Sequence, residues 1–177
     1  MVAGLRAERP DIWLSVSVTT RSPRPGEVNG REYHFVSDEA FGAMVARGEL
    51  LEWARFTDKM YGTPRAPVEK RVAAGVPTLL EIELQGARQV RSTMPQAQFV
   101  FLVPPSWDEL DRRLSDRGTE PRDVIEARLA RAKVELAAES EFDKVIVNDD
   151  VGRAAAELVS LIEAVCAKHD QPNRQES

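Results

Sequence analysis

Hydroxyl, guanidinium, carboxylate and phenol groups are concentrated in one stretch of the sequence, SVSVTTRSPRPGEVNGREYHF, from Ser15 to Phe35. Pro23 and Pro25 exclude a regular helix there and bias the residues before them toward extended backbone. Arg21 and Arg24 are therefore expected on a stiff loop that leaves the C-terminal end of a strand, where ligands collect in open α/β sheets. Two guanidinium groups on such a loop can hold a phosphate from two directions.

One more residue of this stretch and one from further along the chain bear on the same site. The hydroxyl groups of Tyr33 and Tyr61 could add hydrogen bonds to a bound phosphate. A structural interpretation stands beside the functional one: Arg21 and Arg24 could pair with nearby acids such as Glu27 and stabilise the turn. Exposed ion pairs contribute little stability, so the rest of the chain has to decide between the two interpretations.

A carboxylate and two hydroxyls favour binding of a guanine base. Ser17, Glu52 and Thr63 have the chemistry that suits its edge, where N1–H and N2–H₂ donate hydrogen bonds and O6 accepts. Adenine cannot donate the two hydrogen bonds that such a carboxylate accepts from guanine, so a site of this kind would discriminate against AMP.

These residues must be positioned by an α/β core with an inserted lobe. Helical patterns separate the later apolar runs, which predicts a parallel sheet with crossover helices. Ser106 is predicted to cap a helix, with Glu109 completing a capping box and Gly118 ending the helix. Between the first strand and Thr78, short segments separated by Gly, Pro and Asp predict a small mixed lobe. The predicted core strands are Leu14–Val18, Thr78–Glu83, Phe99–Val103 and Lys144–Val147.

Composition narrows the classes of partner. The 177-residue chain is long enough for one domain, alone or with an inserted lobe, and its net charge of −5 argues against a nucleic-acid or membrane surface. Arg outnumbers Lys by 19 to 5, which a GC-rich genome explains before any function does. The single cysteine, Cys166, excludes an internal disulfide framework and is expected to be a core residue. No apolar run is long enough to span a bilayer, so we expect a cytoplasmic protein.

The chain resembles the guanylate kinase family, enzymes that transfer a phosphoryl group from ATP to GMP. The similarity extends from near Met1 to about Ala167. Besides the opening stretch, it rests on motifs that match in order and spacing: GELLEWARF, YGTPRAPV, LLEIELQGARQV, FLVPPSWDELDRRL, DRGTE and KVIVNDD.

The resemblance implies a P-loop nucleoside-monophosphate kinase fold with a GMP-binding arm and a helical lid. It implies a core of residues 1–20, 78–112 and 132–167, an arm of 21–77, a lid of 113–131 and a flexible tail of 168–177. The implied GMP site consists of Ser17, Arg21, Arg24, Glu27, Tyr33, Glu52, Tyr61, Thr63 and Glu83.

The resemblance also implies a donor site and a catalytic set. Arg117 would lie beside the adenine of ATP, Asn148 close to the same base, and Arg128 would reach the transferring phosphoryl group. The implied catalytic residues are Arg21, Arg117 and Arg128. Glu83 departs from the family, which usually has an Asp at that position near GMP and the metal-bound waters.

One expected motif does not occur in the sequence. The family carries a central first strand, between the Thr78 and Phe99 strands, followed by a GPSGxGKST loop that holds the ATP phosphates and Mg²⁺. No Lys follows a Gly anywhere in this sequence. We therefore expect Mg²⁺ to arrive as Mg-ATP, with its usual loop ligand missing and no protein metal site. We favour a start assigned inside the true chain. The competing hypotheses are a genuine loop-less protein that binds GMP or a protein partner without catalysis, and a degenerate fragment.

The expected partners are GMP and ATP, and the expected reaction is ATP-dependent phosphorylation of GMP to GDP. Two alternatives stay open. The chain could be a non-catalytic GMP-binding or protein-interaction module of the same fold. It could also be a kinase for another phosphorylated acceptor, such as a ribose phosphate, which would have no use for the guanine-reading set.

Overall fold

The computed structural model describes Leu5 and residues 9–56, 58–115 and 122–169. The chain forms two compact units, one within Arg6–Ala97 and one within Gln98–Ser177 together with Leu5. The first unit contains β1 (Trp13–Leu14), β2 (Val18–Thr19), β3 (His34–Phe35), α2 (Asp38–Ala46), β4 (Leu50–Phe56), β5 (Lys59–Pro64), α3 (Arg65–Ala73), β6 (Thr78–Leu79) and α4 (Leu84–Thr93). The second contains β7 (Val100–Val103), α5 (Trp107–Ser115), α6 (Arg122–Ala137), the 3₁₀ helix η1 (Glu139–Glu141), β8 (Lys144–Val147) and α7 (Val151–His169).

Both units contain parallel strand pairs, and in the first unit β2 also pairs parallel with β3. β1 pairs with β6, Trp13 opposite Thr78, and β7 pairs with β8 from Val100 opposite Lys144 onward. Helices α5 and α6 make the crossover between β7 and β8, as a parallel pair requires. The predicted parallel pairing with crossover helices is confirmed for β7 and β8, and β1 and β6 also pair parallel, with the inserted lobe between them.

The prediction of one continuous strand over Leu14–Val18 is wrong. Trp13 and Leu14 pair with β6, whereas Val18 and Thr19 pair with β3 and β5 in a different sheet. The change occurs at the two serines: Ser15 N donates to Leu79 O at 3.0 Å, and Ser17 O accepts from His34 N at 2.8 Å. Alternation of apolar and polar residues predicts extended backbone, but it does not show which strand lies beside that backbone.

The predicted strand Thr78–Glu83 is shorter than expected. Only Thr78 and Leu79 pair with β1, and Glu83 takes the N-cap position of α4 with extended backbone angles. A run of apolar and acidic residues does not show where a strand gives way to the turn before a helix.

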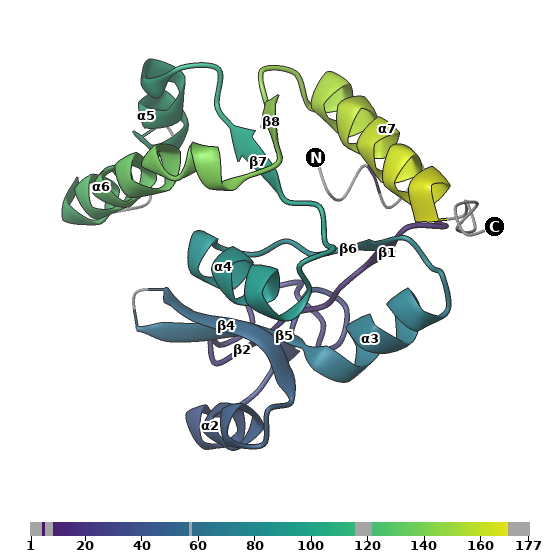
Figure 1. The fold of residues 1–177 in the computed structure, drawn as a ribbon. Helices are drawn as coiled ribbons and strands as arrows, with labels where there is room; N and C mark the ends of the chain where they lie inside the picture. The colour runs from purple at the N-terminus through teal and green to yellow at the C-terminus, as the bar shows by residue number, and fades with distance from the viewer. Residues whose placement is uncertain (1–4, 6–8, 57, 116–121, 170–177) are drawn as a thin grey trace. The chain divides into compact units, whose positions relative to one another are not determined.

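A four-stranded sheet in the order β3-β2-β5-β4 makes up the rest of the first unit. Because side chains alternate along a strand, its faces differ. Val18 lies opposite Gly62, on the face that packs against α2, whereas Glu52 lies opposite Thr63. Helix α4 packs against β4, and α2 lies on the other side of the β4–β5 hairpin (Figure 1). One face is therefore apolar, and the other carries the polar side chains.

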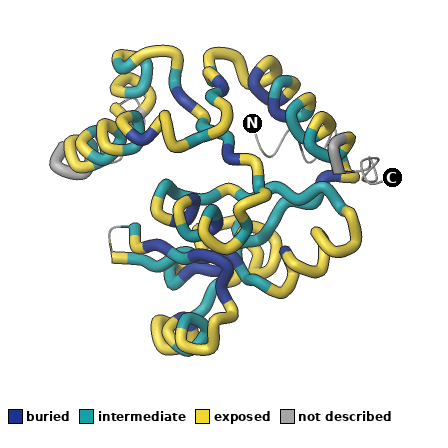
Figure 2. Tube along the Cα trace, viewed as in Figure 1, coloured by how far each residue is buried: buried dark blue, intermediate teal, exposed yellow. Residues whose placement is uncertain are grey.

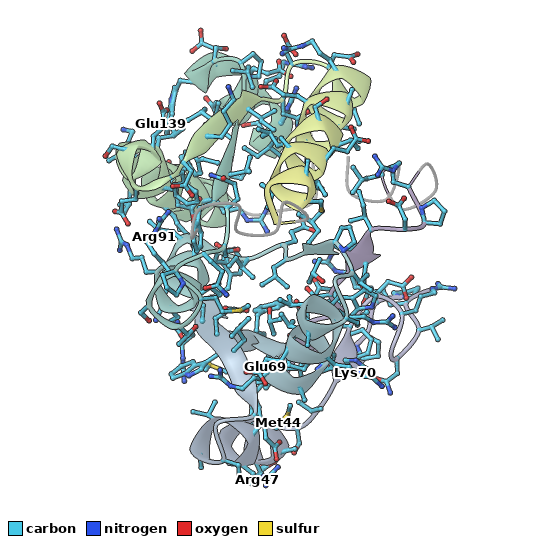
Figure 3. The ribbon with its side chains drawn as sticks, turned by 45° about the vertical axis from the view of Figure 1, so that its right-hand side comes forward. Met44, Arg47, Glu69, Lys70, Arg91 and Glu139 are labelled. Atoms are coloured by element: carbon cyan, nitrogen blue, oxygen red, sulfur yellow. The ribbon has the colours of Figure 1, made fainter. Side chains whose placement is uncertain are left out.

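The apolar face is closed by Phe41 of α2, which is 1% exposed. Its core includes Val18 and Leu50, and a register shift between Leu50 and Glu52 marks a bulge in β4. Met44 packs against this core, while Arg47 just past the helix end is exposed and pairs with Glu49 (Figure 3). Buried positions in the first unit gather along β4 and β5 (Figure 2).

In the second unit, the predicted cap of α5 is confirmed: Ser106 Oγ accepts from Glu109 N at 3.1 Å. The Glu109 carboxylate accepts hydrogen bonds from Arg112 and Arg113, which lower the pKa of Glu109 to about 2. The predicted stop at Gly118 lies outside the described residues. No helix in the described part of the chain has the length and apolar character needed to cross a bilayer.

The Phe41 core yields a stability prediction. Phe41→Ala should lower the free energy of unfolding by about 3–5 kcal/mol, because a buried aromatic ring is lost and a cavity remains. Val72→Ala on α3, where the side chain is 43% exposed, is the control and should change it by less than about 0.5 kcal/mol. Urea unfolding followed by circular dichroism measures both. Equal losses in the two variants would contradict the packing assigned to Phe41.

Candidate functional site

The polar face of the four-stranded sheet is organised around Glu52, a carboxylate only 5% exposed. Thr63 lies opposite it on β5 and donates from Oγ1 to Glu52 Oε1 at 2.6 Å. Burial raises the pKa of Glu52, the nearby Glu83 carboxylate adds to the rise, and the hydrogen bonds from Thr63 oppose it. An ionised carboxylate has about four lone-pair sites, so Thr63 uses only part of its acceptor capacity.

Close approach of β4 and β5 at this point depends on Gly62. A Cβ on Gly62 would lie 2.9 Å from Glu52 O, closer than real Cβ atoms come, and 3.1 Å from Trp53 Cβ, tighter than most real contacts. Gly62 therefore lets the two strands meet where Glu52 and Thr63 are paired, and its neighbours Tyr61 and Thr63 share the opposite face.

The predicted phosphate-binding arginine, Arg21, is held in a fixed orientation. Its Nη1 and Nη2 donate to the two carboxylate oxygens of Glu27, each at 2.9 Å, and Nη1 also donates to Ser22 O. The hydrogen bonds to Glu27 raise the pKa of Arg21 and, reciprocally, lower that of Glu27. The structural interpretation thus applies to Arg21. For Arg24 it is the backbone N that donates to Glu27, at 2.7 Å, and its side chain is exposed.

Aromatic rings surround the Arg21 guanidinium. Its Cζ lies 5.3 Å from the ring centroid of Tyr33 and 5.7 Å from that of Phe35. Tyr33 and Tyr61 meet edge to face, with centroids 6.0 Å apart. Burial raises the pKa of Tyr33, so its hydroxyl stays protonated and able to donate at neutral pH. Arg21, Glu27, Tyr33 and Tyr61, predicted to act together, are brought together here.

Thr19 supports this cluster and was not predicted as part of it. It is fully buried, donates from Oγ1 to Met60 O at 2.9 Å and accepts from Arg21 N at 3.1 Å. Thr19 therefore anchors the start of the loop that carries Arg21. The paired threonines just before Arg21 were the available signal in the sequence.

The remaining predicted acceptor residues lie in the same unit. Ser17 is half-buried in the step between β1 and β2, and Glu83 is half-buried at the N-cap position of α4. Glu83 is near enough to Glu52 to raise its pKa. Glu83 therefore lies on the Glu52 side of the predicted site.

The predicted donor residues belong to the second unit. Arg117 lies outside the described residues, and Arg128 is half-buried on α6. Asn148 follows β8, and its N donates to Val103 O at 2.7 Å. Its Oδ1 is buried without a hydrogen-bond partner among the described residues. Arg113, not predicted as a site residue, donates to Asn148 O at 3.2 Å and so ties α5 to the end of β8.

The described residues do not form a protein metal centre. Over Leu5, 9–56, 58–115 and 122–169, no three or more His, Cys, Asp or Glu side chains are grouped so that they could hold a metal ion. Glu52 and Glu83 alone do not make such a set.

Comparison with known proteins agrees with this fold. The family described as "Guanylate kinase" matches residues 5–165. A guanylate kinase from Streptomyces coelicolor is 62% identical over 165 residues, covering 93% of this chain and 84% of its own length. One from Frankia casuarinae is 64% identical over 162 residues, covering 92% and 88%. The crystal structure of guanylate kinase from Anaplasma phagocytophilum matches with a TM-score of 0.77 at 36% identity, covering 91% of this chain and 80% of that one.

The parallel strands, crossover helices and structural match define a fold of the nucleoside-monophosphate kinase type, a class of phosphotransferases. Within that class, the chain belongs to the guanylate kinase family. The predicted fold class and family are confirmed. The roles of individual side chains stay predictions.

The raised pKa of Glu52 predicts a specific pH dependence of stability. In the unfolded chain this carboxyl ionises near its ordinary pKa of 4.5, whereas in the folded chain it ionises at a higher pH. Between these two values the folded state binds more protons, so the contribution of Glu52 to the free energy of unfolding falls as pH rises. Below both values this loss is absent, and above both it is complete.

Glu52→Gln isolates this effect, because glutamine keeps an oxygen that can accept from Thr63 and does not titrate. The free energy of unfolding of wild type minus that of the variant should fall as pH rises above 4.5. Urea denaturation at a series of pH values measures this difference. A difference that rises with pH would show that the folded site favours the charged form.

Proposed function

We propose that this chain acts as a guanylate kinase that holds GMP on the polar face of the four-stranded sheet and phosphorylates it to GDP with ATP. The observation that carries the proposal is the buried Glu52 carboxylate, hydrogen-bonded to Thr63 and beside Glu83. Burying a carboxylate is costly unless it gains partners. The N1–H and N2–H₂ groups of guanine supply two donors, and Ser17 and Thr63 supply hydroxyls for the rest of the base.

The phosphate of GMP would bind at Arg21 and Arg24, with the hydroxyls of Tyr33 and Tyr61. A guanidinium has five N–H donors, and the three hydrogen bonds to Glu27 and Ser22 leave two that those partners do not use. The Arg21–Glu27 pair supports this role because it orients the guanidinium before the phosphate arrives. Little side-chain entropy is then lost on binding.

The reaction requires no strong general base from the protein. A phosphate monoester has a second pKa of about 6, so the attacking oxygen of GMP is largely deprotonated at neutral pH. Catalysis then consists of aligning two anions and neutralising the charge that spreads in the transition state. We assign orientation of the acceptor to Arg21 and charge neutralisation on the transferring group to Arg128 and Arg117.

We propose that ATP binds with its adenine near Asn148. The partnerless Oδ1 of Asn148 supports this, because the exocyclic amine of adenine is a donor that could satisfy it. Magnesium would enter as Mg-ATP, supplying charge neutralisation on the phosphates. In this proposal residues 21–77 act as the GMP-binding arm and 113–131 as the lid.

The guanine half of the proposal predicts the effect of removing the charge. Glu52→Gln should weaken GMP binding about tenfold or more, because hydrogen bonds to a charged group contribute about 1.5–3 kcal/mol each. AMP binding should stay weak in both proteins. Titration calorimetry of the 177-residue chain with GMP, AMP and ribose 5-phosphate measures this. Equal affinity for GMP and ribose 5-phosphate would favour the kinase of another phosphorylated acceptor.

The phosphate half predicts a loss that depends on the phosphate. Arg21→Lys should weaken GMP binding about tenfold, because lysine lacks the paired donors of a guanidinium, and should leave guanosine binding nearly unchanged. Arg31→Lys is the matched control, because Arg31 is exposed and pairs with Glu32. An equal loss for GMP and guanosine would place Arg21 outside the phosphate site.

Phosphoryl transfer itself is tested with a coupled assay for ADP formation from ATP and GMP. GDP formation by the purified chain would establish the proposed reaction. Tight GMP binding without ADP formation would instead assign the 177-residue chain to the non-catalytic GMP-binding alternative.

A further inference from the structure

Helix α4 packs against β4 and contacts the guanine-reading carboxylate through a glycine. Gly86 is buried in the first turns of α4, and Glu52 is the neighbour that its missing side chain would meet. A Cβ built on Gly86 would overlap Glu52 Oε2 and would lie 2.9 Å from Cδ and 3.3 Å from Cγ. The Glu52 side chain thus occupies the space that any other residue at position 86 would fill.

Glu52 cannot easily move aside to make that space. Its Oε1 accepts from Thr63 at 2.6 Å, and the residue is 5% exposed, so a new rotamer would break the hydrogen bond inside a packed region. Gly42 on α2 offers a contrast: a Cβ there would meet no atom within 4 Å. Helical geometry alone does not explain the lack of a side chain at Gly86, because alanine is the better helix former.

A second residue of α4 fixes the helix to the strand beside Glu52. Gln89 Oε1 accepts from Trp53 N at 3.1 Å, and Gln89 Nε2 donates to Trp53 O at 2.6 Å. β4 lies at the edge of its sheet, so this amide satisfies backbone groups that a neighbouring strand would otherwise pair with. In α4, therefore, Gln89 holds the Trp53 backbone next to Glu52, and Gly86 leaves room for the Glu52 carboxylate. Figure 3 shows the helix, with Arg91 labelled.

We propose that Gly86 is a specificity-determining positioning residue: its lack of a side chain, with α4 clamped to β4 by Gln89, places the Glu52 carboxylate where it reads the N1–H and N2–H₂ groups of guanine. This inference rests on the proposed function, because it presumes that Glu52 contacts the base. If Gly86 only allowed helix and strand to pack, Gly86→Ala would lower stability and weaken all nucleotides alike.

The first test is a stability cycle that does not involve any nucleotide. Gly86→Ala should lower the melting temperature, whereas Gly42→Ala should leave it unchanged or raise it. Glu52→Asp shortens the side chain and withdraws the carboxylate from position 86, so Gly86→Ala should cost clearly less in that background. An equal loss in both backgrounds would show that the new methyl group does not act through Glu52, and would overturn the inference.

The second test compares GMP with IMP, which lacks the 2-amino group, by titration calorimetry on the full chain. Gly86→Ala should weaken GMP about tenfold, a change of about 1.4 kcal/mol, and IMP less, so that the preference for GMP falls. Gly42→Ala should leave the preference unchanged. In the Glu52→Gln background, Gly86→Ala should not alter the preference for GMP over IMP further, because Glu52 no longer reads the base.

The outcomes separate this inference from the proposed function. A lowered preference for GMP in Glu52→Gln with an unchanged preference in Gly86→Ala overturns the positioning role alone. An unchanged preference in Glu52→Gln overturns the guanine-reading role and the inference with it. Where Gly86→Ala is too unstable to titrate, Gln89→Met tests the clamp without adding volume at position 86 and should lower the preference in the same direction.

Discussion

Burial of the Glu52 carboxylate is the constraint on which much of the first unit depends. A charged group that is 5% exposed is stable only if its surroundings supply hydrogen bonds and tolerate its shape. Thr63 supplies the hydrogen bond, Gly62 lets the two strands approach, and Gly86 leaves the space. The pKa of Glu52 is raised because burial disfavours the charged form of its carboxyl. A bound base that donates to the carboxylate would relieve that cost.

The proposed phosphate side of the site depends on the orientation of a charged group rather than on its burial. Arg21 and Glu27 satisfy each other in a double hydrogen bond, and the rings of Tyr33 and Phe35 flank the guanidinium. The cation is thus oriented in advance. Around Glu52 the structure holds a buried carboxylate bonded to Thr63, whereas around Arg21 it holds a preformed geometry. In the proposed function, the first would favour GMP through specificity and the second through a lower entropic cost.

The site was more predictable than the strands. Arg21, Glu52 and Thr63 were chosen from the sequence for their chemistry, and the structure places all three in the first unit, while their roles stay predictions. Leu14–Val18 was predicted as one strand because alternating apolar and polar residues indicate extended backbone but not the strand that pairs with it. Thr19 was missed although paired threonines precede Arg21, because its role depends on burial, and Gly86 was missed because a helical glycine has no chemical signature of its own. Their importance lies only in which atoms stand next to them.

By itself, the sequence determined the residue types of the acceptor site, the parallel pairing of its apolar runs and the membership in a kinase family. The first two follow from local chemistry and periodicity, which each segment carries alone, whereas the family follows from the resemblance of motifs in order and spacing along the chain. Only the tertiary structure decided that Arg21 is paired with Glu27, that the chain changes sheets between Ser15 and Ser17, and that α4 limits the space around Glu52. Contacts between distant segments depend on packing, and no single segment encodes the atoms that will meet it.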